Sequence, residues 1–193
     1  MTFWFDPGCP WTWATSRWLV EAAERRDLRV RWRLLSLAVL NADRDLEPAM
    51  RERLEFGARV LRVFAAVPDN AARGRLFAAY AERVHARKEA FEPATVRAAL
   101  ADARLDPSLV ATMDEAALDA VVRADHDAAQ EAAGGESGSP VMEYRGAGWF
   151  GPVLSPAPKG EEAGEVWDDL TRFITRDEVF EVKRGRTRGP RVA

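Results

Sequence analysis

The sequence predicts an α/β fold in which a β-α-β unit and a later β-β-α unit are separated by an all-helical block. A strand-like run, a helical pattern and an alternating segment follow one another before residue 42. Ala, Leu, Arg and Glu then recur at helical spacing without a convincing strand, and strand signals return only after Gly138. Four regions are therefore expected: a first core part (1–42), a helical insertion (43–135), a second core part (136–180) and a basic tail (181–193).

The N-terminal unit opens with a short, aromatic-rich run at Thr2–Phe5, which predicts a buried strand. A helix is expected from about Pro10 to Arg26, because Ala14, Trp18, Leu19 and Ala22 fall on one of its faces. Residues 28–34 then alternate apolar side chains with arginines, a pattern typical of a strand with one apolar face. The arginines suit an edge strand protected from further pairing. A β-α-β unit makes its two strands parallel.

The insertion is expected to form a small helical bundle over the sheet. Proline after an acidic residue marks a helix start, because proline fits the first helical position. The expected helices run from Pro48 to about Ala66, from about Asn70 to Lys88, from Pro93, from Pro107, and from about Asp114 to Ala133.

The second core part contains a hairpin and a closing helix. Residues 140–144 and 149–151 are strand-like and flank a loop with two glycines. The helix from about Glu161 to Ile174 is expected to bury Val166, Leu170, Phe173 and Ile174. The basic, glycine-punctuated tail that follows is expected to be a frayed terminus. The order of elements matches a thioredoxin-like core interrupted between its second and third strands.

Cys9 is the only cysteine in the chain, and it lies between a Pro-Gly turn and Pro10. Proline at the first helical position makes Cys9 the N-cap, where free backbone N–H groups and the helix dipole favour a thiolate. We therefore expect the pKa of Cys9 to lie below the ordinary value of roughly 8.5. The alternative is a structural cysteine, since free cysteines are among the most buried residues. Asp6 would disfavour the thiolate if close, and its expected role is to cap the turn.

Composition excludes several classes of function. A net charge of −3 gives no general reason to expect binding to nucleic acid or membranes. No segment approaches the roughly 20 apolar residues of a membrane-spanning helix, and the N-terminus lacks the pattern of a signal peptide. A lone cysteine fits a reducing compartment, so a cytoplasmic protein is expected. No metal is expected, because His85 and His126 are each interpreted as part of a solvated helix face.

The chain resembles the DsbA-like thioredoxin superfamily, and more narrowly its actinobacterial mycothiol-dependent oxidoreductase/nitroreductase branch. The residues that carry the resemblance are Phe5-Asp6-Pro7-Gly8-Cys9-Pro10-Trp11 with Thr15-Ser16-Arg17-Trp18-Leu19, then Gly138-Ser139-Pro140, and the run from Gly151 to Gly160. These stretches flank the helical block at both ends, so the resemblance covers essentially the whole chain.

The resemblance implies roles for six residues. Cys9 would be the attacking cysteine, and Ser139-Pro140 would be a cis-proline loop beside it that binds an extended thiol substrate. Pro10 and Trp11 would contact the substrate, although Trp11 could equally pack against the helical block. Dithiol members carry a second cysteine where this chain has Thr12. Thr12 would either stabilise the thiolate through its hydroxyl or be an ordinary helix residue.

The leading hypothesis is a monothiol oxidoreductase that forms a mixed disulfide on Cys9 and is regenerated by an external thiol. Mycothiol is the first choice for that thiol, with glutathione as the alternative, and the partner is a small-molecule or disulfide substrate. A second hypothesis is a thiol transferase or isomerase like the kappa-class glutathione transferases, which activate a bound thiol. A third is a redox-inert binding protein of the same fold. Whether the chain forms a homodimer stays open.

Overall fold

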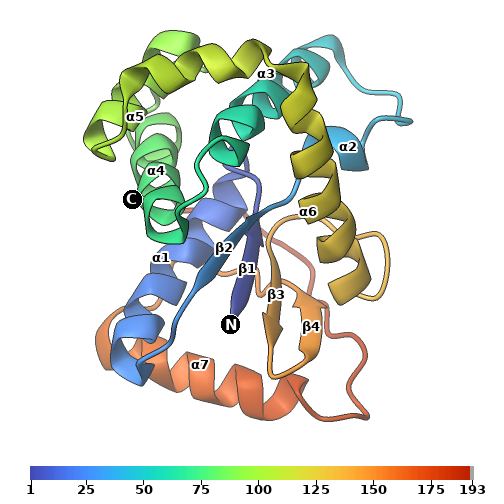
Figure 1. Ribbon diagram of the computed structural model, residues 1–193. Helices are drawn as coiled ribbons and strands as arrows, with labels where there is room; N and C mark the ends of the chain where they lie inside the picture. The colour runs from blue at the N-terminus through green and yellow to red at the C-terminus, as the bar shows by residue number, and fades with distance from the viewer. Residues whose placement is uncertain (192–193) are drawn as a thin grey trace.

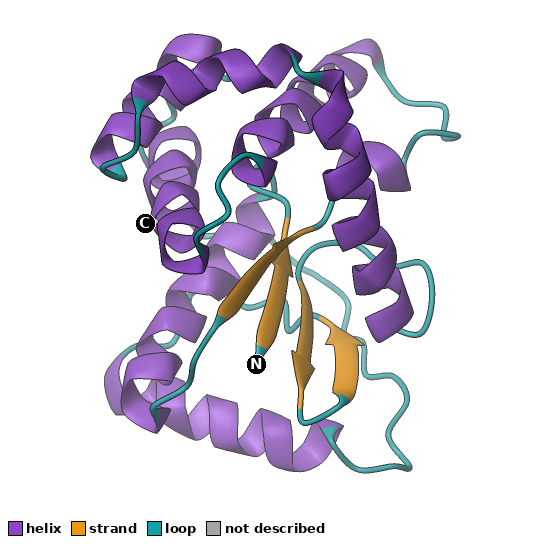
Figure 2. Ribbon diagram, viewed as in Figure 1, coloured by secondary structure: helices purple, strands orange, loops and turns teal. Residues whose placement is uncertain are grey.

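The computed structural model describes residues 1–191 and contains one four-stranded mixed sheet. Its strands are β1 (Thr2–Phe5), β2 (Arg31–Leu34), β3 (Val141–Tyr144) and β4 (Ala147–Phe150), in the order β2-β1-β3-β4. Strand β1 is parallel to β2 and antiparallel to β3, and β3 pairs antiparallel with β4 (Figures 1 and 2). This confirms the α/β thioredoxin-like core and places β2, with its arginines, at an edge.

The helices follow the predicted order. They are α1 (Pro10–Arg26), α2 (Leu37–Leu40), α3 (Pro48–Ala65), α4 (Asn70–Ala81), the π-helical turn η1 (Glu82–Ala86), α5 (Pro93–Asp102), the 3₁₀ segments η2 (Pro107–Asp114) and η3 (Ala116–Leu118), α6 (Asp119–Ala132) and α7 (Gly160–Ile174). Figure 1 shows the block from α3 to α6 at one end of the sheet and α7 crossing at the other. The last helix of the insertion begins later than predicted, because 3₁₀ turns occupy the chain before Asp119.

Alternation along β1 divides the core between the two faces of the sheet. Phe3 and Phe5 pack into the larger apolar cluster with α1, α3 and α4, whereas Trp4 packs on the opposite face with Leu35 and residues of α6. Phe5 stacks on Phe77 of α4 with ring centroids 4.3 Å apart. These aromatic contacts attach the helical insertion to the strand that leads into Cys9.

The buried face of α7 agrees with the prediction in part. Val166, Leu170 and Ile174 are partly buried against the core, as expected. Phe173 is 47% exposed, however, and the fully buried residues of the helix are Ala163, Gly164 and Trp167. The reason is its close packing on α1: Trp18 Nε1 donates to the Ala163 carbonyl at 2.9 Å, and a Cβ at Gly164 would lie 2.5 Å from the Arg26 guanidinium. Small residues set this face because α1 approaches the α7 backbone. Within residues 1–191, no helix is both long and apolar enough to cross a membrane.

We predict that Gly148→Ala destabilises the protein by about 1–3 kcal/mol, because overpacking forces backbone shifts. A Cβ there would lie 2.0 Å from the Ala132 carbonyl oxygen, so β4 and α6 would have to separate. Gly57→Ala is the matched control: it lies in α3 with no atom within 4 Å of the added Cβ. That change should stabilise by about 0.5–1 kcal/mol. Urea unfolding of both variants measures the difference, and equal stabilities would contradict the packing of β4 on α6.

Candidate active site around Cys9

Cys9 is the N-cap of α1, as predicted, and it lies where the chain leaves the C-terminal end of β1. Its backbone is extended (φ −89°, ψ 114°), and Pro10 takes the first helical position. The Cys9 N–H donates to the Asp6 carbonyl at 3.1 Å, which closes a tight turn over residues 6–9, the cysteine loop. The Cys9 side chain is only 8% exposed. Cys9 is therefore largely shielded from solvent.

The loop that contains Ser139 and Pro140 lies directly against Cys9. The Ser139–Pro140 peptide bond is cis, and the Cys9 thiol donates to the Ser139 carbonyl with Sγ and O 3.8 Å apart. The Ser139 hydroxyl oxygen accepts a hydrogen bond from the Asp6 N–H at 2.9 Å. The structure thus brings together two segments separated by 130 residues in the sequence.

Thr12 is also part of this arrangement. It is completely buried one turn into α1, and its Oγ1 lies 2.7 Å from Ser139 Oγ. Of the six residues named from the sequence, Cys9, Thr12, Ser139 and Pro140 are buried, while Pro10 and Trp11 are partly exposed. The partial exposure of Trp11 agrees with the prediction.

Within the described residues, the C-terminal tail has no helix or strand and is exposed over residues 181–189, but three of its arginines contact Trp11 or Ser155. The Arg186 guanidinium lies 4.9 Å from the centre of the Trp11 ring. Arg188 donates to the Ser155 carbonyl at 2.9 Å, and the Arg191 N–H donates to Ser155 Oγ at 2.6 Å. Nothing in the sequence pattern distinguishes these arginines from ordinary solvated ones.

Asp6 caps the turn, as predicted, and has a second partner. One carboxylate oxygen accepts from the Gly8 N–H and the other from the Leu37 N–H, both at 2.8 Å. Burial raises the pKa of Asp6 to about 6, although these two N–H groups and Arg53 oppose the shift. The carboxyl therefore joins the cysteine loop to the chain that enters the helical insertion.

Two residues of the insertion hold the cysteine loop and were missed by sequence reasoning. His85 Nε2 lies 2.9 Å from the Pro7 carbonyl, and since a carbonyl only accepts, Nε2 carries the proton. Arg53 donates to the Gly8 carbonyl at 3.0 Å. Because each pair is separated by dozens of residues, no local pattern could have revealed it.

The interpretation of both histidines as parts of solvated helix faces is wrong. His85 is 3% exposed, and burial lowers its pKa to about 4. His126 is buried too, and its Nδ1 accepts a long hydrogen bond from the Ser36 N–H at 3.4 Å. Both rings are held by the backbone. Within residues 1–191, no group of His, Cys, Asp or Glu has the arrangement of a metal site.

The expected low pKa of Cys9 is also wrong for this conformation. Burial raises the pKa of the thiol and is the largest effect, with the nearby Asp6 carboxylate acting in the same direction. Hydrogen bonds from the Thr12 hydroxyl and from the Thr12 and Trp11 N–H groups oppose it without overcoming it. The N–H groups at the helix terminus favour a thiolate, but burial removes the water that would also stabilise it. At neutral pH, the resting group is therefore the thiol.

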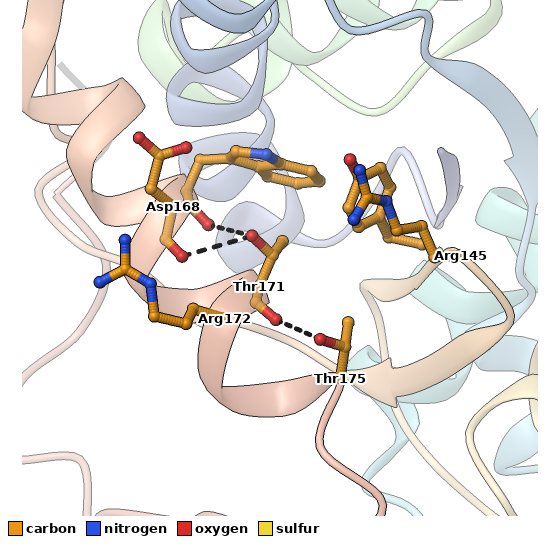
Figure 3. Close-up of a pocket in the computed structure, with 7 residues that line it drawn as sticks. Arg145, Asp168, Thr171, Arg172 and Thr175 are labelled. Carbon is orange, nitrogen blue, oxygen red and sulfur yellow. Dashed lines mark hydrogen bonds between the residues drawn. The ribbon is translucent and has the colours of Figure 1, made fainter.

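A cavity of about 310 Å³ elsewhere in the molecule lacks comparable chemistry. It lies between the β3–β4 hairpin and α7, where Thr171 and Thr175 donate to α7 carbonyls at 2.8 and 2.6 Å (Figure 3). Its two arginines, Arg145 and Arg172, lie on opposite sides of Thr171 (Figure 3). The two threonine hydroxyls are thus already hydrogen-bonded, Asp168 is paired with Arg26, and the two arginine side chains do not converge.

Comparisons with known proteins identify a family and a fold. A family model described as Rv2466c-like, mycothiol-dependent nitroreductase Rv2466c, matches residues 8–184. The protein named "Uncharacterized protein Rv2286c" of Mycobacterium tuberculosis (strain ATCC 25618 / H37Rv) is 27% identical over 186 residues, covering 94% of this chain and 80% of that protein. The solved structure of 2-hydroxychromene-2-carboxylate isomerase aligns with a TM-score of 0.63 at 15% identity, covering 89% of this chain and 94% of that one. This last likeness concerns the fold alone.

The two buried groups that hold the cysteine loop are predicted to affect stability in opposite directions with pH. Between about pH 4 and 6, Asp6 keeps its proton in the folded protein but loses it in the unfolded chain, so its contribution to the free energy of unfolding falls as the pH rises. Over nearly the same range, His85 binds a proton in the unfolded chain but not in the folded protein, so its contribution to the free energy of unfolding increases as the pH rises. The two effects largely cancel in the wild type.

The free energy of unfolding of Asp6→Asn should therefore increase from pH 4 to 6.5. That of His85→Gln should decrease over the same range. Each change should amount to up to about 3 kcal/mol relative to the wild type. Urea unfolding at several pH values measures the slopes. Each variant keeps one hydrogen bond to the loop, since the Asn carbonyl can accept from Gly8 and the Gln amide can donate to Pro7. Wild-type slopes in both variants would contradict the assigned protonation states.

Proposed function

The chain belongs to the family of Rv2466c-like mycothiol-dependent nitroreductases, and on that premise we propose that it is a monothiol oxidoreductase that exchanges disulfides through Cys9 alone. Family membership makes the protein an enzyme of the thiol-dependent oxidoreductase type. The observation that carries the monothiol proposal is Thr12: the position of the second cysteine in dithiol members holds a hydroxyl, and the chain has no other thiol.

The proposed reaction has two displacement steps. The Cys9 thiolate attacks one sulfur of a substrate disulfide, the Cys9–S–S–R bond forms, and the other half leaves as a thiolate that takes up a proton. The thiolate of an external thiol then attacks the substrate-derived sulfur of this mixed disulfide. Cys9 leaves as a thiolate, and the product is a disulfide between substrate and external thiol. Two electrons therefore pass between external molecules, and the enzyme returns to its starting state.

The geometry supports this sequence of steps at three points. The Ser139 carbonyl holds the resting thiol, and the Thr12 hydroxyl can donate to the sulfur once it is ionised. Pro10 and Trp11 are partly exposed beside Cys9, where they would contact the substrate. Because no second thiol competes for the mixed disulfide, its resolution depends on the external thiol.

We assign mycothiol as that thiol, because the matched family is described as mycothiol-dependent. Glutathione is the alternative co-substrate. The lone cysteine cannot form an internal disulfide and suits a reducing compartment, which supports a cytoplasmic role. The partners are a small-molecule thiol and a small-molecule or disulfide substrate, and the proposed chemistry needs no metal.

A second candidate function is favoured by the paired hydroxyls of Thr12 and Ser139. Beside a helix N-terminus, such a pair could polarise the thiol of a bound cofactor, as in kappa-class glutathione transferases and related isomerases. In that case the sulfur that reacts would belong to the ligand, and Cys9 would be dispensable. The two candidates therefore differ in the effect of removing the Cys9 sulfur.

We predict that Cys9→Ser abolishes disulfide exchange, since a serine hydroxyl is hardly ionised at neutral pH. In the wild type, treatment with a mild disulfide oxidant plus mycothiol or glutathione should produce a one-to-one mixed disulfide. Intact-mass analysis should detect this adduct in the wild type and not in Cys9→Ser. Retention of most activity in Cys9→Ser, with a larger loss in Thr12→Val, would overturn the monothiol mechanism and support the second candidate.

We further predict that Thr12→Cys converts the protein to a dithiol enzyme. The cap and the third helical position lie within bridging reach, so oxidation should form an internal disulfide without an external thiol. Intact mass would then show the loss of two hydrogens, and no adduct would accumulate. Thr12→Ser is the matched control and should form the same mixed disulfide as the wild type. If oxidised Thr12→Cys carries an adduct in place of the internal bond, the assumed geometry is wrong.

A further inference from the structure

We propose that Arg186 is a specificity-determining residue that binds a carboxylate on a small disulfide substrate as the substrate approaches Cys9. This inference rests on the proposed function, because it concerns the disulfide that Cys9 attacks in the first displacement step. It assigns the chemical class of that substrate, which the exchange reaction alone leaves open. The external thiol of the second step is chosen independently of this contact.

Trp11 places the Arg186 guanidinium next to the cysteine loop. Trp11 follows Cys9 by two residues, and the guanidinium carbon of Arg186 lies 4.9 Å from the centre of its ring. A cation near the face of a tryptophan is attracted by the negative potential of the ring. Such a contact engages only the side of the guanidinium that faces the ring. The N–H donors on its other side therefore remain available to an acceptor.

The tail is attached to the same helix as the reactive cysteine, so Arg186 has a defined position. Two residues after it, Arg188 donates to the Ser155 carbonyl at 2.9 Å. The segment that contains Ser155 is itself bound to α1, because the Thr15 hydroxyl donates to the Pro152 carbonyl at 3.0 Å. Arg186 is therefore held by two contacts that both lead back to α1, one at the tryptophan ring and one at Ser155.

Arg186 has no carboxylate partner within residues 1–191. It forms neither an ion pair nor a side-chain hydrogen bond there, whereas Arg26, Arg62 and Arg83 each have a carboxylate 2.6–2.9 Å away. Arg186 is also exposed, so a ligand can reach it. A guanidinium binds a carboxylate through two parallel N–H···O bonds, which the compact ammonium of a lysine cannot form. A carboxylate is thus the group that matches this side chain.

The charge of the surrounding chain favours an anion at this place. Residues 181–191 contain five basic side chains and one acidic side chain, although the whole chain carries a net charge of −3. Asp6 is a buried carboxyl of the cysteine loop, and the positive charge of Arg53, which donates to the Gly8 carbonyl, opposes its charge. A positive rim raises the local concentration of anions and speeds their association.

Arg186 acts on the substrate rather than on the thiol. The charged group that shifts the pKa of Cys9 is Asp6, and Arg186 makes no contribution to that shift. A neutral reagent should therefore react with Cys9 at the same rate whether or not the guanidinium is present. Cys9 is only 8% exposed and the tail lies against Trp11, so the site suits a small molecule better than a folded protein.

The test compares an anionic and a neutral aromatic disulfide as probes of Cys9. The anionic probe is 5,5′-dithiobis(2-nitrobenzoate), with a carboxylate on each ring, and the neutral probe is 4,4′-dithiodipyridine. Stopped-flow absorbance measures the second-order rate of mixed-disulfide formation. Arg186→Gln should slow the anionic probe by about tenfold, the effect of losing one hydrogen-bonded ion pair, and leave the neutral probe unchanged. Arg186→Lys should restore only part of the rate, because an ammonium cannot form the paired bonds.

Arg184→Gln is the matched control, because it removes the same charge from an exposed position two residues earlier in the tail. It should slow the anionic probe by less than about twofold, since exposed charges are screened by salt. An equal loss in Arg184→Gln, equal slowing of both probes in Arg186→Gln, or a wild-type rate of that variant with the anionic probe would each overturn the proposal. If neither probe modifies Cys9 in the wild type, disulfide exchange is absent, and the proposed function fails together with this inference. If both probes do so and Arg186→Gln leaves the ratio of their rates unchanged, only the role of Arg186 fails.

Discussion

The hydrogen bonds of the cysteine loop are the constraint on which the rest of the site depends. The loop is largely buried, and buried backbone N–H and C=O groups need partners. Three of these groups have distant partners: Ser139 accepts from the Asp6 N–H, His85 binds the Pro7 carbonyl and Arg53 binds the Gly8 carbonyl. They come from the cis-proline loop and from two different parts of the helical insertion. The loop can therefore adopt this conformation only when all three regions have assembled around it.

Through these contacts, the insertion forms part of the candidate active site. Phe5 stacks on α4 immediately before the loop, and the Asp6 carboxylate accepts from the Leu37 N–H at the start of α2. The first contact joins the strand end that carries Cys9 to a helix of the insertion, and the second joins it to the segment that leads into the insertion. The same enclosure desolvates the thiol, so the pKa of Cys9 is raised even though it lies at a helix N-terminus. The same burial therefore both fixes the position of the cysteine loop and keeps the resting Cys9 thiol neutral.

Local sequence patterns predicted those helices and strands whose bounds depend on interactions within the element itself. The bounds of β1 and α1 were obtained from aromatic content, the Pro-Gly turn and proline at the first helical position, and all of these signals lie within the element itself. The buried face of α7 could not be obtained this way, because it is set by how closely α1 approaches Gly164. The roles of His85 and Arg53 depend on partners 78 and 45 residues away. The pKa of Cys9 depended on the same distant packing.

With threonine in place of the second cysteine, the site keeps the Cys9 thiol but has no internal thiol to resolve a mixed disulfide. A cysteine at position 12 would resolve a mixed disulfide from inside the protein, so the external thiol would need no path to the bound sulfur. A threonine cannot form that bond, but its hydroxyl stays beside Cys9 and is anchored by Ser139 at 2.7 Å. In the proposed mechanism, the second thiol approaches from solvent, where Pro10 and Trp11 are partly exposed. Arg186 stacks on Trp11, so the tail borders this approach.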